Sequence, residues 1–213
     1  MGVGVVWDSG IYRDRGGCCK DVEMKADEDI QAEGGECVNF SQQIKQSNTD
    51  EWYTPKEPVK LIAKILRRNG YNNILCPFDK ADSNFVTVLT EQGFNVTYSH
   101  IDTGIDFFDI QNLSDYDAVV SNPPFSKRQR ILERLFESNV PFAMIINFNG
   151  LFDSKARWKL FRDNRFELLV PLGRIHFFNE ECVGNSPNFQ SVFVCKSMSD
   201  KQIEFVEMEG SCT

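Results

Sequence analysis

Long apolar runs are missing from this sequence, and none approaches the ~20 residues that a membrane-spanning helix needs. The segment from Met1 to Trp7 has neither a basic region nor a long apolar stretch, so no secretion signal is predicted. Internal repeats and long low-complexity segments are missing as well. The composition is ordinary for a globular protein, with 213 residues of which 41% are hydrophobic and 25% charged. It predicts one domain with an additional arm.

Metal-ligating patterns are also scarce. The chain has only two histidines, and its seven cysteines include no C-x-x-C pair, so no metal site is predicted. The odd number of cysteines, their irregular spacing and the missing secretion signal favour reduced thiols and a cytoplasmic location. Cys76 and Cys195 lie in apolar, strand-like runs, and we expect both to pack in the core.

Basic residues are outnumbered, with 23 Lys and Arg against 31 Asp and Glu and a net charge of −8. This balance argues against a general polyanion binder. The charge is uneven, however. Residues 1–50 hold ten acids and five bases, whereas residues 126–174 hold five acids and ten bases. We therefore expect an acidic, partly disordered arm at 1–50 and a domain at 51–213, where local, salt-sensitive binding of nucleic acid stays open.

Helical and strand-like patterns alternate from residue 51 onward. Apolar residues at a spacing of three to four, such as Val59, Ile62 and Leu66, indicate a helix, whereas the continuous run 118–120 is typical of a strand buried on both faces. Helices are expected at 55–69, 83–92, 126–137 and 154–163, and strands at 73–78, 95–101, 105–108, 116–121, 142–148, 166–171, 191–196 and 203–208. The alternation predicts an α/β fold with a mostly parallel central sheet, helices on both faces and a ligand site at the carboxyl ends of the strands.

The sharpest motif is Asn122-Pro123-Pro124-Phe125, which directly follows an apolar strand. The two prolines fix φ and donate no backbone hydrogen bonds, so the loop is stiff. The Asn122 amide oxygen and the Pro123 carbonyl can accept hydrogen bonds from one amino group, and Phe125 offers a flat face for a planar ring. The alternative interpretation is a rigid turn with Phe125 in the core.

This tetrapeptide resembles the (Asp/Asn)-Pro-Pro-(Tyr/Phe) motif of class I, AdoMet-dependent amino-methyltransferases. Residues 52–196 most resemble small phage or bacterial N6-adenine DNA methyltransferases. The resemblance implies a Rossmann-like methyltransferase fold, S-adenosyl-L-methionine (AdoMet) as cofactor and DNA as partner, with the target adenine flipped out of the duplex. Asn122 and Pro123 would bind the amine, Phe125 would stack on the base, and the methyl group would be transferred directly. Enzymes that methylate an RNA guanine or a protein glutamine amide share the motif and remain alternatives.

The expected cofactor loop matches its counterpart in the family only in part. One adenine-methylating branch has the form Pro-Phe-x-Gly-x-Gly-Ser-x-Phe, and the matching residues are Pro77, Phe78, Ser83 and Phe85. Lys80 and Asp82 replace the two glycines that let the backbone approach the cofactor. Either Lys80 pairs with the cofactor carboxylate and Asp79 or Asp82 with its ammonium, or the site has degenerated and the chain is a methyltransferase-like binding protein.

The resemblance implies further contacts. The methionine end of AdoMet would meet Trp52, Tyr53, Thr54 and Pro55. Asp102, with His100 beside it, would bind the ribose hydroxyls, Asp106 the adenine amino group, and Phe107 the adenine ring. The plainer interpretations are a hydrophobic staple with Pro55 at the start of a helix, a loop acid at Asp102 and a core pair of Phe107 and Phe108.

Cations follow the tetrapeptide. Ser126 and Gln129 have the spacing of a capping box, which predicts that a helix starts at Ser126. Basic residues cost stability in the first turn of a helix, so we expect Lys127, Arg128 and Arg130 to serve an anionic partner such as nucleic-acid phosphate, unless they form a solvated basic turn. Further along, Trp158 and Phe161 alternate with basic residues, as on nucleic-acid surfaces, or form the buried stripe of their helix.

Overall fold

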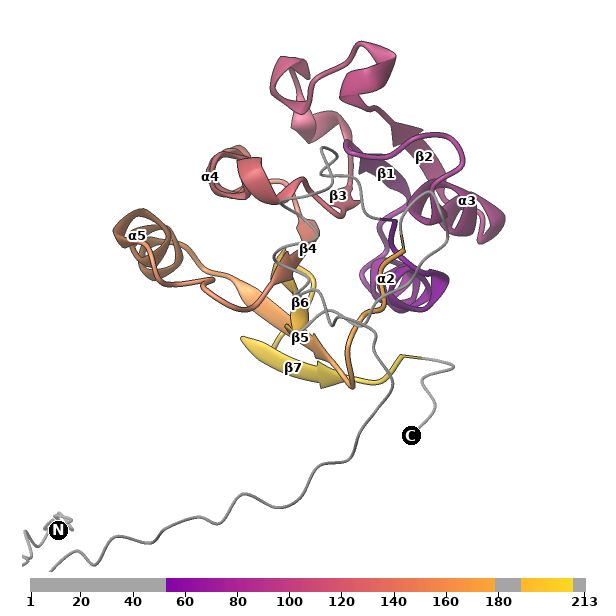
Figure 1. Cartoon of the computed structure of the whole chain (residues 1–213). Helices are drawn as coiled ribbons and strands as arrows, with labels where there is room; N and C mark the ends of the chain where they lie inside the picture. The colour runs from indigo at the N-terminus through magenta and orange to yellow at the C-terminus, as the bar shows by residue number, and fades with distance from the viewer. Residues whose placement is uncertain (1–52, 179–188, 209–213) are drawn as a thin grey trace, which may run out of the picture. The chain divides into compact units, whose positions relative to one another are not determined.

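The computed structural model describes residues 53–178 and 189–208, drawn in colour in Figure 1. The arm expected at 1–50 and the expected cofactor residue Trp52 lie outside the described residues. Within the described ranges, no helix is long and apolar enough to cross a membrane.

A seven-stranded sheet forms the centre of the described chain, in the order β2-β1-β3-β4-β6-β5-β7 (Figure 1). The strands are β1 (Asn73–Cys76), β2 (Asn95–Tyr98), β3 (Ala118–Ser121), β4 (Phe142–Asn147), β5 (Glu167–Pro171), β6 (Ser191–Lys196) and β7 (Ile203–Val206). Strand β6 runs antiparallel to both of its neighbours, and every other pairing is parallel. The expected α/β class with a mostly parallel sheet is therefore confirmed.

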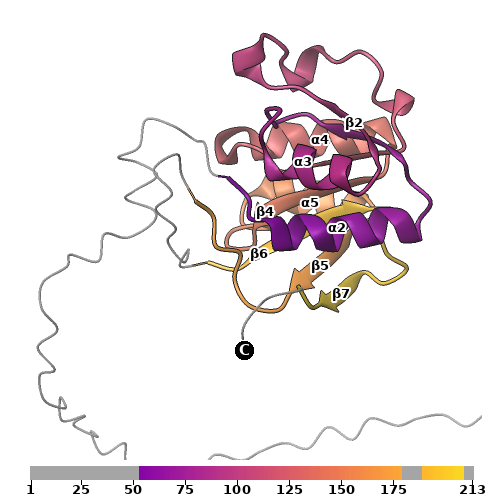
Figure 2. The same cartoon turned by 90° about the vertical axis from the view of Figure 1, so that its right-hand side faces the viewer.

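Within the described residues, four α-helices cover the two faces of the sheet. They are α2 (Lys56–Arg68), α3 (Asn84–Glu91), α4 (Arg128–Ser138) and α5 (Lys155–Asp163). Helices α2 and α3 share a core cluster with Ile74 and Val120, and Figure 2 shows them in front of the strands. Helices α4 and α5 pack with Leu75 and Val119. Because successive strand side chains point to opposite faces, the two clusters lie on opposite sides of the sheet.

Helix boundaries follow local chemistry. Val59, Ile62 and Leu66 of α2 are fully buried, as their spacing predicts, and Gly70 ends the helix with φ +76, a conformation that glycine adopts without strain. Ser83 caps α3 by accepting a hydrogen bond from the backbone N–H of Val86. The Ser83 cap fixes the start of α3, and so the end of the loop that leaves β1 at the carboxyl edge of the sheet.

The prediction of a strand at 105–108 was wrong, because the chain forms a 3-10 turn at Phe107–Asp109. Asp106 accepts a hydrogen bond from the backbone N–H of Phe108, which bends the chain. The guanidinium of Arg134 on α4 donates to the carbonyls of Phe107 and Ile110. These local bonds take the place of a sheet ladder, and β2 is the outermost strand on this side of the described sheet.

The prediction that Ser126 and Gln129 form a capping box was also wrong. The chain leaves Pro124 in a 3-10 turn at Phe125–Lys127, and α4 begins only at Arg128. The Lys127 N–H donates to the Pro124 carbonyl, and the Gln129 side chain donates to Glu133. The fixed geometry of the two prolines commits the chain to this tight turn before a helix can start.

The opposite edge of the sheet is apolar. In β7, the outer strand of the described sheet, Ile203 is 53% exposed and Phe205 82% exposed. Cys76 and Cys195, in contrast, are completely buried in the cluster on the α2 side, as expected.

Candidate functional site

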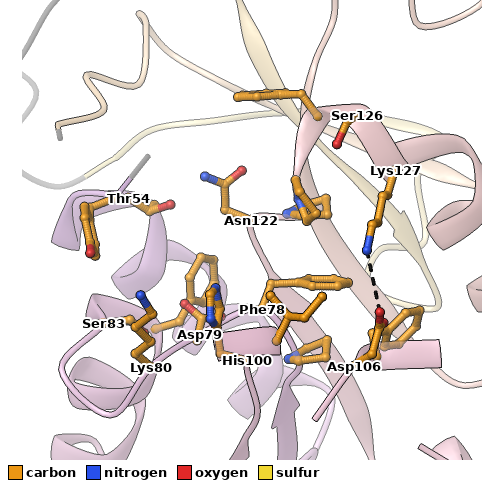
Figure 3. A pocket seen from close by; sticks show the side chains of 18 of the residues that line it. Thr54, Phe78, Asp79, Lys80, Ser83, His100, Asp106, Asn122, Ser126 and Lys127 are labelled. Atoms are coloured by element: carbon orange, nitrogen blue, oxygen red, sulfur yellow. Dashed lines mark ion pairs between the residues drawn. The ribbon is translucent and has the colours of Figure 1, made fainter. Parts of the chain in front are cut away.

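A cavity of about 290 Å³ opens at the carboxyl ends of β1, β2 and β3 (Figure 3). This is the edge of the sheet where the alternation of elements predicted a ligand site. The loops after these three strands and the segment before α2 contribute its walls. The cavity therefore draws on four stretches of chain that are far apart in sequence.

The tetrapeptide Asn122 to Phe125 lines this cavity in full. It follows Ser121, the last residue of β3, so the strand fixes where Asn122 begins. The Phe125 ring is half-buried and packs edge-on against Phe189 at a centroid distance of 6.5 Å. Phe125 is therefore part of the cavity wall rather than of the closed core. The loop thus brings an amide side chain and an aromatic ring to the lining of one cavity.

The loop after β1 supplies both charge and apolar surface. Pro77, Phe78, Asp79 and Lys80 line the cavity, whereas Asp82 does not. The Lys80 Nζ lies 2.8 Å from Oδ2 of Asp102, an acid that is itself outside the cavity lining. Two residues expected to bind different parts of the cofactor are thus joined to each other. The ion pair ties the loop after β1 to the loop after β2.

His100 also lines the cavity and contacts the same acid. Its Nδ1 accepts a hydrogen bond from the backbone N–H of Asp102 at 3.2 Å. In the neutral imidazole this bond assigns the proton to Nε2. His100, which the sequence identified only as a neighbour of Asp102, is therefore a lining residue held by the loop after β2.

Asp79 is buried in the wall between two loops. Its Oδ2 accepts a hydrogen bond from Ser121 Oγ at 2.5 Å. Burial raises the pKa of Asp79 to about 6, and hydrogen bonds from Ser121 and Ser83 act in the opposite direction by favouring the carboxylate. The carboxylate is thus held by hydroxyl groups on the loops after β1 and β3.

Thr54 carries a buried polar atom at the cavity. Its carbonyl accepts a hydrogen bond from the Asn84 side chain at 2.8 Å, but Oγ1 makes no hydrogen bond to any residue in 53–178 or 189–208. Buried hydroxyls normally have a partner, so this position suits a polar group of a ligand. Tyr53 lines the cavity beside it, whereas Pro55 lies at the N-cap of α2 and does not line the cavity.

The far wall of the cavity is formed by Asp106, Phe107 and Phe108. The Phe107 ring is buried and lies 5.1 Å from the Phe78 ring between centroids, so it is both a core residue and a lining residue. Asp106 pairs with Lys127 at 3.5 Å between Oδ2 and Nζ (Figure 3). An acid and two aromatic rings therefore lie together in this part of the cavity lining.

The three residues expected to contact nucleic acid, Lys127, Arg128 and Arg130, have different surroundings in the structure. Only Lys127 lines the cavity. The guanidinium of Arg130 lies 4.7 Å from the centroid of the Phe108 ring. Burial, with a smaller contribution from nearby Arg157, lowers the pKa of Arg128. Arg128 and Arg130 thus lie outside the cavity lining, and Arg130 is exposed.

Trp158 and Phe161 on α5 also differ in their burial. Phe161 is buried, whereas Trp158 is 52% exposed and carries the Arg162 guanidinium 4.9 Å above its ring. Phe161 is the one buried residue of α5, so the expected buried stripe of Trp158 and Phe161 is not formed.

Sequence reasoning gave no role to several residues of the site. They are Asn84 and Ile101, which line the cavity, and Ser121, which bonds to Asp79. Ser121 carried a usable signal, because a polar residue at the end of a strand buried on both faces requires a hydrogen-bond partner.

No family model matches the sequence, and no curated protein is similar to it. Solved structures similar to the chain include the EcoKI M protein of a type I restriction enzyme, with 12% identity, a TM-score of 0.47 and coverage of 76% of this chain and 49% of that one. A type I restriction-modification methyltransferase subunit from Streptococcus thermophilus has 14% identity, a TM-score of 0.44 and coverage of 74% and 47%. Precorrin-6y C5,15-methyltransferase from Geobacter metallireducens GS-15 has 14% identity, a TM-score of 0.39 and coverage of 70% and 95%. The chain spans about half the length of the two restriction-enzyme proteins.

Proposed function

We propose that this protein is an AdoMet-dependent methyltransferase that acts on an exocyclic amine, namely adenine N6 in DNA. The observation that carries the proposal is the Asn122-Pro123-Pro124-Phe125 loop, which leaves the carboxyl end of β3 and lines the cavity. The loop supplies an amide, a proline carbonyl and an aromatic ring at one cavity. That combination suits a planar, amino-bearing ring.

The residues around the cavity fit AdoMet. The hydroxyl of Thr54 is buried there without a partner among the described residues, and Phe78 and Phe107 offer apolar faces for an adenine ring. Asp106 lies beside those rings and can accept from an amino group. The volume of about 290 Å³ is near the lower end of ligand pockets, which span about 300–1,000 Å³.

AdoMet, when bound, supplies an electrophilic methyl group, and the protein contributes position and electrostatics. The Asn122 side chain and the Pro123 carbonyl would accept the two N–H bonds of the target amine and direct its lone pair into the cavity. Phe125 would stack on the ring and hold its plane. Preorganised acceptors and orientation of this kind account for large parts of enzymatic rate enhancements.

Radiolabelled AdoMet tests the proposal. We expect label to enter DNA, and N6-methyladenine to be released when that DNA is digested. The Asn122→Ala variant should lose turnover by at least about a hundredfold, because an acceptor aimed at the reacting amine is removed, while its affinity for AdoMet stays close to that of the wild type. Label in RNA or protein but never in DNA would reject adenine N6 of DNA as the target. Equal turnover by Asn122→Ala would reject the assigned role.

One observation favours a second candidate, a binding protein of the same fold without catalysis. Lys80 replaces a glycine of the family motif, and its Nζ is already held at 2.8 Å by Asp102. Calorimetry separates the candidates, since a methyltransferase must bind AdoMet. If wild-type protein gives no heat at millimolar AdoMet, and Lys80→Gly also gives none, the binding-protein candidate is favoured.

A further inference from the structure

We propose that Asp79 is a positioning residue that orients the Asn122 loop through Ser121, so that the loop after β1 and the loop after β3 form one unit. The inference rests on the proposed function and deepens it. It gives Asp79 a task different from contact with the cofactor ammonium.

The first step is the contact itself. Ser121 is completely buried, Asp79 is only 7% exposed, and Ser121 Oγ donates to Asp79 Oδ2 at 2.5 Å. A buried hydroxyl bonded to a carboxylate is held more tightly than one bonded to a neutral acceptor. The side chain of Ser121 therefore has a defined direction.

The second step carries that direction to the reacting groups. Ser121 is the last residue of β3, and Asn122 and two prolines follow it directly. Proline fixes its own φ and restricts the residue before it, so this stretch has few soft torsions. A rotation at Ser121 would therefore move Asn122 and Phe125 together.

The third step concerns what holds Asp79. Its carboxylate also accepts a hydrogen bond from Ser83, the N-cap of α3. Its backbone N–H donates to the Ser99 carbonyl at 3.1 Å, just after β2, and the Ser99 N–H donates to the Cys76 carbonyl at 3.1 Å. Asp79 is thus fixed by the ends of β1 and β2 and by α3 while it holds the end of β3.

The protonation of Asp79 should make the orientation of the Asn122 loop depend on pH. Burial raises its pKa to about 6, so the carboxylate is ionised at neutral pH and takes up a proton in mild acid. Other titratable groups around it are Lys80, His100 and Asp106 in the same cavity and the buried thiol of Cys76 at the end of β1. Burial, and secondarily Asp79 itself, raise the pKa of that thiol well above its usual range. Because His100 lines the same cavity as Asp79, variants of both residues are needed.

Amide hydrogen exchange tests the inference without any turnover. In the full-length protein, Ser121→Ala should speed exchange of the non-proline amides at 122–127 about tenfold, the loss expected for one buried hydrogen bond. Ser121→Thr, which keeps the hydroxyl, should restore slow exchange. Ser138→Ala is the matched control, because it removes a serine hydroxyl that bonds the Leu135 carbonyl at the end of α4. It should leave exchange at 122–127 unchanged.

Kinetics test the consequence for catalysis. Ser121→Ala and Asp79→Asn should lower kcat for methyl transfer about 10- to 100-fold with AdoMet affinity nearly unchanged, since misplacement of a reacting group affects the rate. The pH profile of the wild type should fall toward acid with an apparent pKa near that of Asp79. This limb should vanish in Asp79→Asn and persist in His100→Gln.

The outcomes decide between the inference and the proposed function. Unchanged exchange at 122–127 in folded Ser121→Ala and Asp79→Asn overturns the inference whatever the activity. An acid limb that vanishes in His100→Gln but not in Asp79→Asn overturns it as well. If no variant, nor the wild type, transfers methyl groups, the proposed function fails, while the exchange data still decide whether Asp79 orients the loop.

Discussion

At the scale of single residues, the site depends on one buried acid more than on its exposed charges. Lys80, Asp102, Asp106 and Lys127 form ion pairs at partly exposed positions, where such pairs contribute little to stability. Asp79, in contrast, is buried between hydroxyls without an ion pair among its described contacts. Its burial is therefore costly whenever it is ionised.

The pH dependence of stability should reveal this cost. Asp79 has a pKa of about 6 in the folded chain against 3.8 for an ordinary aspartate. The folded state therefore binds the proton more tightly, and its contribution to stability, about 3 kcal/mol from the size of this shift, is lost as pH rises from about 4 to about 6. Urea unfolding of Asp79→Asn should lack this loss. Asp82→Asn, an exposed acid of the same loop, should retain it.

The sequence predicted that the tetrapeptide lies at the carboxyl edge of the sheet and is followed by Lys127. It did not predict the hydrogen bond between Ser121 and Asp79. The tetrapeptide is continuous and follows a recognisable strand, so its place at the carboxyl edge follows from the fold class. Ser121 and Asp79 are 42 positions apart, and only the pairing of β1 with β3 brings them together. No periodicity in a single sequence specifies such a contact.

At the scale of elements, α4 stabilises a turn that the sequence had assigned to a strand. The guanidinium of Arg134 donates to the carbonyls of Phe107 and Ile110 and lies 4.7 Å from the centroid of the Phe107 ring. The aromatic residues at 107–108 favoured a strand by propensity. The Arg134 side chain on α4 stabilises a turn instead. Because Arg134 is distant in sequence, the local pattern at 105–108 could not predict the turn.

Arg134→Lys tests this element. Lysine keeps the charge but cannot donate to two carbonyls in a planar fork, so we expect a loss of about 2–3 kcal/mol of unfolding free energy. Exchange should quicken at residues 107–110, and AdoMet binding should weaken because Asp106 and Phe107 line the cavity. Arg162→Lys, an exposed guanidinium on α5, serves as control and should change neither property. Unaltered exchange at 107–110 in Arg134→Lys would contradict the assignment.

At the scale of the whole molecule, the net charge of −8 does not describe the cavity edge. Residues 1–50 contribute −5 and residues 51–213 only −3. Lys127 reaches the cavity from the basic stretch, beside the loop that would bind the base. Nucleic-acid binding, if it occurs at this edge, is therefore local and sensitive to salt.

Salt titrations of DNA binding test this picture. Deleting residues 1–50 should strengthen binding at low salt, because an acidic segment is removed, and the difference should shrink as salt screens the charges. Lys127→Gln should lower the slope of log affinity against log salt by about one, with Lys64→Gln on α2 as the matched control. Deletion without effect at any salt concentration would show that the acidic segment does not compete with DNA.

The apolar side chains of β7 have a practical consequence. An outer strand that exposes Phe205 and Ile203 on one face, and that has no further strand beside it among residues 53–178 and 189–208, is a template for unwanted strand addition. Concentrated samples should therefore self-associate slowly, and Phe205→Lys should delay this in light scattering without lowering the unfolding midpoint. The edge farthest from the cavity would then limit how the protein can be handled, stored and crystallised.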